Sequence, residues 1–405
     1  MFPQLSSDFG RLGHSAAILL ALAKDPAETI CTSAVQAVSC LYKILFSQKE
    51  PTKSKQKRLR WAVRRSPRQS KEKACPSAPS LVQESIWHMA KGPEDQLFST
   101  QLTSLLLAVL DNLRGSNTET LRASEEVLHA VLQNHARKVE QVKEVVAAIY
   151  TCLQAHPASF WVRKVLLKAL GYLLPFHLEE VVCSCLSFSI PVNRQARQLW
   201  TAMASGPQVA MQVLQILLKS LQVKDPQESN EDILAVSLAA MNVIYECFGI
   251  PDYRPALMEM QAQLFIPMLS QVCCVRRLAL PKDLQARQED IMKQDPKALT
   301  FRSTSVEIIK GLFSLGKDWA VYARIEFQAG WTVLDTPGKF LQGTRLLARA
   351  MMECDSPQIR GVFSEAVSIL NNEEDEMKKV TALALMVEAS AVVGMDSLLD
   401  KGQDL

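Results

Sequence analysis

Apolar residues recur at the spacing of one helix face along most of this 405-residue chain, with polar residues between them. Three stretches show the i, i+3, i+4, i+7 spacing: Val162, Val165, Leu166, Ala169, Leu170 and Leu173; Leu214, Leu217, Leu218 and Leu221; and Ile359, Val362, Phe363, Ala366, Val367 and Leu370. Strand signals are scarce, because alternating runs of Val, Ile or Thr bounded by turn residues do not stand out. The pattern therefore predicts an all-α protein.

Short breaks of Pro, Asp, Gly and Asn separate the helical segments, and pairs of segments repeat about every 30 to 45 residues. Such a pair cannot bury its apolar face alone, so we expect an irregular α-solenoid of roughly six to nine stacked helical hairpins. The two strongest breaks, at residues 223–230 and 278–296, are expected bends. The predicted helices are 15–24, 29–46, 96–114, 118–135, 139–155, 159–174, 178–188, 193–204, 207–222, 230–248, 255–277, 299–315, 317–331, 338–353, 356–370 and 373–393.

Composition divides the chain into four parts. Residues 1–47 are predicted to form an N-terminal helical element, and residues 81–393 form the main helical array. Between them, residues 48–80 are basic, contain Pro and Ser, and hold few large apolar residues. Such a composition cannot offset its ordering entropy, so we expect a disordered linker or inserted loop there. Residues 394–405 are a C-terminal tail.

Three segments share an apolar residue followed by arginine at the start of an amphipathic helix. They contain Arg163 (WVRKVLLKALGYL), Arg302 (FRSTSVEIIKGLF) and Arg360 (DSPQIRGVFSEAVSIL). This pattern resembles the second helix of HEAT repeats, the relatives of armadillo-like arrays. Within that group, residues 232–390 resemble the Maestro HEAT-like repeat family. The first half departs from the pattern, because no Asp precedes Arg163 or Arg194.

The resemblance implies that Arg163, Arg302 and Arg360 are structural repeat arginines, since in HEAT proteins an Asp and an Arg bond across successive repeats. It also implies an array that curves into a superhelix and binds proteins without catalysing a reaction. We therefore expect a non-enzymatic scaffold or adaptor that binds protein partners through its helical surface. Direct contact of these arginines with a partner is the alternative interpretation of the three side chains.

Catalytic, cofactor and metal motifs do not appear in the sequence. The six histidines form no H-E-x-x-H motif and no pair with cysteine at ligand spacing, so we expect no metal site. A phosphate-binding loop, a dinucleotide fingerprint and a nucleophile elbow are also missing, and no cofactor is predicted. An enzyme whose catalytic residues converge from distant positions is the remaining alternative of that class.

Residues 49–73 carry a net charge of +9, whereas the rest of the chain carries −6. The basic residues that surround Leu59 and Trp61 include Lys55, Lys57, Arg58, Arg60, Arg64 and Arg65. A solvated linker is one interpretation of this segment. The others are a nuclear-import signal, a contact with nucleic acid or an anionic membrane surface, and a short helix for a calmodulin-like partner. The alternative function is therefore a nuclear transport or nucleic-acid-associated factor that uses residues 53–73.

The ten cysteines form no C-x-x-C pair, and most lie in apolar helical stretches. Buried thiols fit a reducing compartment, so we expect a cytoplasmic location, or a nuclear one if an import receptor reads the basic segment. A transmembrane segment is not expected, because the longest uncharged stretch, 145–162, is interrupted at His156-Pro157. Neither end shows the polar cap that solenoids need, and a shortened form of a longer array is one interpretation of this feature.

Overall fold

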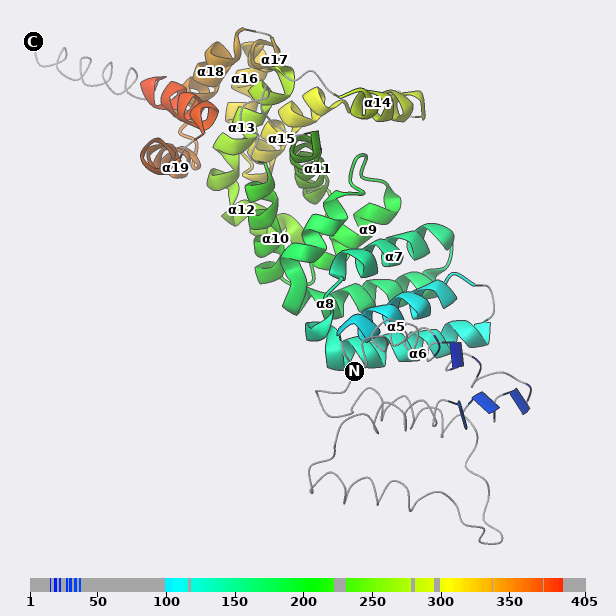
Figure 1. Cartoon of the computed structure of the whole chain (residues 1–405). Coiled ribbons are helices and arrows are strands. Elements are labelled where there is room, and N and C mark those ends of the chain that lie inside the picture. Colours follow the sequence, from blue (N-terminus) through cyan, green and yellow to red (C-terminus); the bar gives the residue numbers. More distant parts are fainter. Residues whose placement is uncertain are drawn as a thin grey trace, which may run out of the picture. The chain divides into compact units, whose positions relative to one another are not determined.

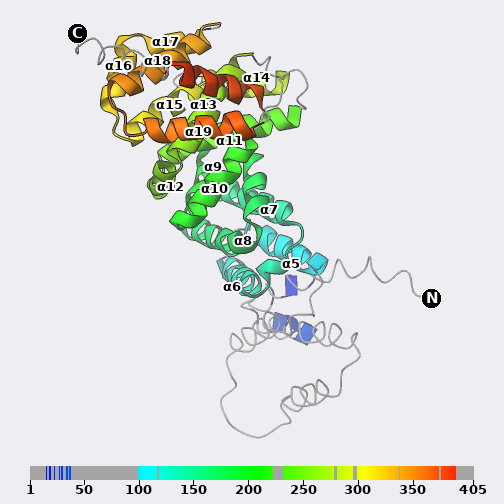
Figure 2. The same ribbon diagram turned by 90° about the vertical axis from the view of Figure 1, so that its left-hand side faces the viewer.

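The computed structural model describes residues 99–115, 118–221, 231–277, 281–294, 299–336, 338–373 and 375–388, together with scattered positions between Ser15 and Ala37. These residues contain no β-strand and only an isolated bridge between Ser189 and Val192. Antiparallel helices joined by short turns fill both parts of the structure (Figure 1, Figure 2). The predicted all-α fold of stacked helical hairpins is confirmed. The chain divides into two compact units, Met1–Val181 and Val182–Leu405.

Several predicted features lie outside the described residues. They are the basic linker at residues 48–80, the C-terminal tail at 394–405 and the break at 223–230. The helical element at residues 1–47 is described only at scattered positions, most of which are helical.

The first unit contains α5 (Ser99–Asn112), α6 (Thr118–His135), the short 3-10 helix η1 (Ala136–Lys138), α7 (Val142–Ala155) and most of α8 (Phe160–Leu186). Helix α5 packs against both α6 and α7. The apolar stripe predicted from Val162 to Leu173 is buried throughout, which confirms the face of α8 that joins the core. Burial of each Val or Leu side chain in this stripe stabilises the fold by roughly 1.5–3 kcal/mol.

Helix α8 bends where the sequence predicted a gap between two helices. Pro175 lies inside it, and His177 has non-helical dihedral angles, with φ −135° and ψ 33°. Proline lacks a backbone N–H and its ring clashes with the carbonyl four residues earlier, so it interrupts the helical hydrogen bonds. The imidazole of His177 holds this bend, because its Nε2 lies 2.9 Å from the backbone oxygen of Ala136.

The second unit contains the end of α8 and eleven further labelled helices. They are α9 (Arg194–Met203), α10 (Pro207–Ser220), α11 (Glu231–Phe248), α12 (Arg254–Glu259), α13 (Gln261–Arg277), α14 (Lys282–Gln294), α15 (Phe301–Leu315), α16 (Trp319–Phe327), α17 (Gly330–Asp335), α18 (Phe340–Glu353) and α19 (Ile359–Asn372), with the 3-10 helix η2 (Pro251–Tyr253) before α12. Residues 376–388 form a last helical stretch. Helix α13 packs against α15 and α19, and α15 also packs against α11 (Figure 1).

Two predictions for the second unit were wrong. Residues 278–296 were expected to be a loose break, but residues 282–294 form α14. Its sequence has almost no apolar face, and it forms because Lys, Gln, Glu, Ala and Arg favour helix. The stripe predicted on α19 is also rotated: Val367 is 45% exposed, whereas Ile369 is buried. The face toward α13 is selected by close packing, since a Cβ on Gly361 would lie 3.1 Å from the Cβ of Ala262.

Candidate functional site

Side chains from one hairpin repeatedly bond to the helix ends of another. In the first unit, the thiol of Cys152 donates to the backbone oxygen of Leu110, 3.0 Å away. In the second unit, Tyr253 Oη donates to the oxygen of Trp200 at 3.1 Å, and Gln271 Nε2 donates to that of Leu221 at 2.6 Å. Each acceptor lies in the last turn or at the cap of its helix, where carbonyls lack intrahelical partners. These bonds therefore fix the register between neighbouring helices.

Two turns of the second unit share one geometry and touch each other. Lys317 follows α15 and Asp355 follows α18, and both have positive φ, 57° and 48°. In each turn, the residue after the one with positive φ donates its backbone N–H to the carbonyl five positions earlier. Asp318 donates to the oxygen of Phe313 at 3.0 Å, and Ser356 donates to that of Met351 at 2.8 Å. This is the Schellman arrangement of helix ends.

The two turns are joined by a hydrogen bond from the Ser356 hydroxyl to the Asp318 carboxylate, and both residues are buried. Gln261 extends the row, because its amide nitrogen donates to the backbone oxygen of Leu312 near the end of α15. Polar contacts at helix ends thus link α13, α15 and α18. The turn at Gly316 is packed so closely that an added Cβ would lie 2.0 Å from Nε2 of Gln358.

The three arginines proposed as repeat residues are not brought together. Arg163 is half-buried, and its Nη2 lies 3.5 Å from the oxygen of Pro157, just before α8. Arg302 and Arg360 are exposed, and no side-chain hydrogen bond of either is seen within the part of the chain that the structure describes. The basic residues predicted to contact anionic partners, Lys55, Lys57, Arg58, Arg60, Arg64 and Arg65, lie outside the described residues.

Ion pairs between helices use other arginines. Arg197 pairs with Glu246 at 3.1 Å, and Arg324 pairs with Glu353 at 2.7 Å. Two further pairs join Arg276 to Asp335 and Arg349 to Glu388. The partners are far apart in sequence, by 59 positions for Arg276 and 39 for Arg349. No local motif marks such pairs, and sequence reasoning missed them for that reason.

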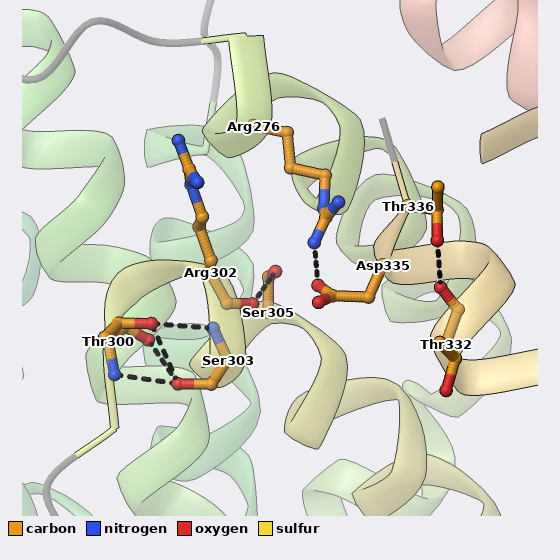
Figure 3. A network of polar contacts seen from close by, with 8 residues as sticks. All are labelled: Arg276, Thr300, Arg302, Ser303, Ser305, Thr332, Asp335 and Thr336. Atoms are coloured by element: carbon orange, nitrogen blue, oxygen red, sulfur yellow. Dashed lines mark hydrogen bonds and ion pairs between the residues drawn. The ribbon is translucent and has the colours of Figure 1, made fainter. Parts of the chain in front are cut away.

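A polar cluster lies where the end of α13 meets the start of α15 and the end of α17 (Figure 3). We call Arg276, Thr300, Arg302, Ser303 and Asp335 the α13–α15 cluster. Thr300 and Ser303 form a capping box, in which each side chain bonds to the backbone N–H of the other, at 3.2 and 2.7 Å.

The Arg276 side chain is only 12% exposed and pairs with Asp335, which is 51% exposed. Burial lowers the pKa of Arg276, and the positive charge of Arg302 lowers it further. The Arg276 guanidinium points toward Asp335, whereas the Arg302 side chain points away from Asp335 (Figure 3).

The outer face of α16 is apolar. Trp319 is 57% exposed, Phe327 is 86% exposed, and Ala323 between them is also exposed. Positions four and eight apart lie on one side of a helix, so the three side chains form a continuous stripe. We call these three residues the α16 surface.

Aromatic contacts connect the α16 surface to the core. Trp319 packs edge-on against Tyr322, with ring centroids 6.3 Å apart, and Tyr322 contacts Trp331 at 5.6 Å. Trp331 then packs against Phe313 at 6.2 Å, and Phe313 against Phe265 at 5.6 Å. Phe313 and Phe265 are fully buried. A series of five rings thus runs from solvent into the interior and holds Trp319 in place.

The described residues contain no group of three or more His, Cys, Asp or Glu side chains placed to hold a metal ion. By length and apolar composition alone, α8 could cross a membrane. The helical segments 233–248 and 251–259 would pass the same test only if they were counted together as one span, although the chain bends by 97° between them. Half of the apolar window of α8 is buried inside the protein. Core helices of soluble proteins pass the same test, so this feature is weak evidence for a membrane span.

The chain is similar to several proteins named for one family. The protein called Maestro heat-like repeat family member 5 from Homo sapiens is 28% identical over 93% of this chain and 30% of its own length. Maestro heat-like repeat-containing protein family member 1 is 27% identical in Homo sapiens, over 74% of this chain and 19% of its own length. The Mus musculus protein of that name is 26% identical, over 93% of this chain and 24% of its own length. The chain thus spans less than a third of the length of these relatives.

Among solved structures, a crystal structure of an engineered protein aligns over 98% of this chain and 92% of its own, at 13% identity. Its TM-score of 0.25 is too low to establish a common arrangement of helices.

A match to a family model gives stronger evidence for the family of this chain. The model described as Maestro HEAT repeats matches residues 1–214. The sequence had suggested the same family from residues 232–390, a stretch that this match does not include, although the alignment with family member 5 covers 93% of the chain. The family match, the relatives and the stacked helical hairpins agree, and the chain belongs to the Maestro HEAT repeat family.

Proposed function

We propose that this protein is a non-enzymatic scaffold that binds protein partners through exposed helical surfaces, and that the α16 surface is one of its contacts. The names of the relatives describe repeats and no reaction, which supports a scaffold. A stack of helical hairpins presents a large surface over which binding energy can be distributed. We place this activity in the cytoplasm, as the cysteine pattern suggests.

The α16 surface carries the proposal because of its composition and exposure. Large apolar side chains that are exposed next to one another mark interaction sites. Tryptophan and other aromatic residues supply much of the binding energy at protein interfaces, particularly when they are held rigidly. Trp319 meets both conditions, since it is 57% exposed and packs on Tyr322.

Charged residues border the apolar stripe. Arg324 and Glu353 pair beside it at 2.7 Å, and both side chains are partly exposed. Polar groups around an apolar centre are the usual rim of a protein interface. The arrangement therefore favours an amphipathic segment of a partner, whose apolar residues would cover Trp319 and Phe327.

Site-specific photo-crosslinking in cells tests this proposal. A photoreactive amino acid at Ala323 should yield discrete crosslinked products with one or a few proteins, whereas the same group at Ala286, an exposed position on α14, should not. The variants Trp319→Ser and Phe327→Ser should abolish these products while the circular dichroism spectrum stays unchanged. Crosslinks that are equal at Ala286, or that survive both substitutions, would refute α16 as a contact. A product that contains only two copies of this chain would assign the surface to self-association.

A further inference from the structure

One face of the last helix that the structure describes, residues 376–388, is apolar and exposed (Figure 1, red ribbon). Val380 is 37% exposed, Leu383 is 54% exposed and Val387 is 44% exposed. Positions three and four apart lie on one side of a helix, so the three side chains form one line, which we call the 376–388 stripe. We propose that this stripe binds the same stripe of a second copy of this chain, as an antiparallel pair of helices. The contact is separate from the α16 surface and does not depend on it.

The opposite side of this helix is fixed to the second unit. Thr381 and Leu385 are fully buried, and the hydroxyl oxygens of Thr381 and Ser270 of α13 lie 3.1 Å apart. The Glu388 side chain is buried and pairs with Arg349 of α18. Because rotation of the helix would break these contacts, the 376–388 stripe stays in solvent unless another molecule or segment covers it.

The composition of the stripe is that of a covered face. In a stack of helical hairpins, a face that meets the next hairpin is apolar, whereas a face that remains in solvent needs polar residues. Helix α14 shows the second type, with Asp283, Glu289 and Lys293 exposed. The 376–388 stripe shows the first type, which favours a second helix packed against it.

The spacing of the stripe makes a second copy a suitable partner. Apolar residues at intervals of three and four form the seam along which two helices pair in a coiled coil. Leu383 lies at the centre, with Val380 about one turn before it and Val387 about one turn after it. An antiparallel pair therefore places Leu383 against Leu383 and Val380 against Val387. The stripe is complementary to itself, as a two-fold symmetric interface requires.

Charge favours the antiparallel direction. Glu376 lies in line with the stripe, one turn before Val380, and its side chain is 85% exposed. A parallel pair would bring the two Glu376 carboxylates together, whereas an antiparallel pair separates them. At the other end of the helix, the Arg349 side chain that pairs with Glu388 is 49% exposed. The antiparallel pair thus brings the acidic end of one copy toward the end at which the other exposes an arginine, and it also aligns the two helix dipoles favourably.

Sedimentation velocity of the full-length chain at about 1 to 100 μM tests the proposal, because so small a contact should give a weak dimer that forms as the concentration rises. The wild-type chain should shift from monomer to dimer. Leu383→Glu should stay monomeric, with an unchanged circular dichroism spectrum, because it places two carboxylates opposite each other. Leu341→Glu, at a leucine of α18 that is 43% exposed, is the matched control and should dimerise like wild type.

Cysteine crosslinking tests the direction of the pair. After mild oxidation, Leu383→Cys should form a covalent dimer that is absent from the wild-type chain, in which Cys183 is already exposed. A mixture of Val380→Cys and Val387→Cys should also crosslink, whereas each variant alone should not. Crosslinking of Val380→Cys by itself would contradict the antiparallel arrangement.

Three results of the sedimentation experiment would overturn the proposal. A wild-type chain that remains monomeric at about 100 μM would leave the stripe to residues 389–405 or to another protein. A dimer that persists in Leu383→Glu would be formed by a different surface. A dimer that is lost in Trp319→Ser would assign self-association to the α16 surface.

Discussion

Ser356 donates a hydrogen bond from its hydroxyl to the carboxylate of Asp318, across 38 positions of sequence. Both residues are buried, and each follows a residue with positive φ at the end of a helix. The bond therefore connects the turn after α15 with the turn after α18. At these two turns the contact between helix ends is made by an Asp and a Ser, and no repeat arginine takes part in it.

Replacement of Ser356 by Ala should destabilise the second unit. The substitution leaves a buried carboxylate without this donor, and an unsatisfied buried acceptor costs about 1–3 kcal/mol. Urea unfolding followed by circular dichroism measures the change. Ser368→Ala, at an exposed position of α19, is the matched control and should stay within about 0.5 kcal/mol of wild type. Equal stability of the two variants would show that the Ser356 bond contributes nothing.

Two glycines in helices should respond oppositely to alanine. A Cβ on Gly343 would lie 2.6 Å from Cα of Leu334, so Gly343→Ala forces α17 and α18 apart and should cost about 1–3 kcal/mol. No atom lies within 4 Å of a Cβ on Gly171 of α8, and Gly171→Ala should stabilise by about 0.5–1 kcal/mol because alanine favours helix. Thermal unfolding of both variants checks the sign. A stabilising Gly343→Ala would contradict the close approach of these helices.

Stability should fall as the pH rises above about 9. Burial raises the pKa of the Cys152 thiol to about 12, and it also raises that of Cys185, Cys247 and Tyr253. Above pH 9 the unfolded thiols lose their protons while the folded ones keep them, so the unfolded state gains relative to the folded state. Each thiol contributes up to about 1.4 kcal/mol per pH unit. Urea unfolding between pH 7.5 and 10.5 should show the decline, and Cys152→Ala should reduce its slope for the first unit. A flat profile would exclude buried protonated thiols.

Substitutions at Arg349 and Arg360 compare an arginine that the structure places in an ion pair with one that the sequence proposed as a structural repeat arginine. The Glu388 side chain is buried and pairs with Arg349, so Arg349→Met should lower the free energy of unfolding by about 1.5–3 kcal/mol. Arg360 is exposed, and Arg360→Met should change it by less than about 0.5 kcal/mol. If Arg360→Met were the more damaging substitution, Arg360 would be the structural arginine that the sequence suggested.

Deletion of residues 53–73 tests the alternative function. The segment is strongly basic and lies outside the described helices, so we expect both units to keep their melting temperatures. Any nuclear accumulation, or binding to nucleic acid or anionic vesicles that weakens with salt, should be lost. Unchanged location and unchanged salt-sensitive binding would remove the support for a nuclear or nucleic-acid-associated role.

Much of the fold could be predicted from local sequence. The stripe from Val162 to Leu173 was predicted to be buried and is buried, because a regular helix converts that spacing into one face. The boundaries of α6, at Thr118 and His135, were also predicted correctly. The bend at His177 coincides with the predicted gap after Leu174, since proline acts on its own helix. These features depend on neighbours within a few residues.

The features of the candidate sites depend on contacts that sequence spacing does not encode. The partner of Ser356 is 38 positions away and that of Arg276 is 59, so no periodicity places Asp318 or Asp335 beside them. The spacing of apolar residues on α16 and α19 does not reveal which of them stay exposed to solvent. In the structure, the exposed ones include Trp319, Phe327 and Val367. The sequence alone determined that the chain forms helices that must pair. Tertiary packing decided which faces meet and which charges are compensated, because burial depends on neighbouring helices and not on the helix itself.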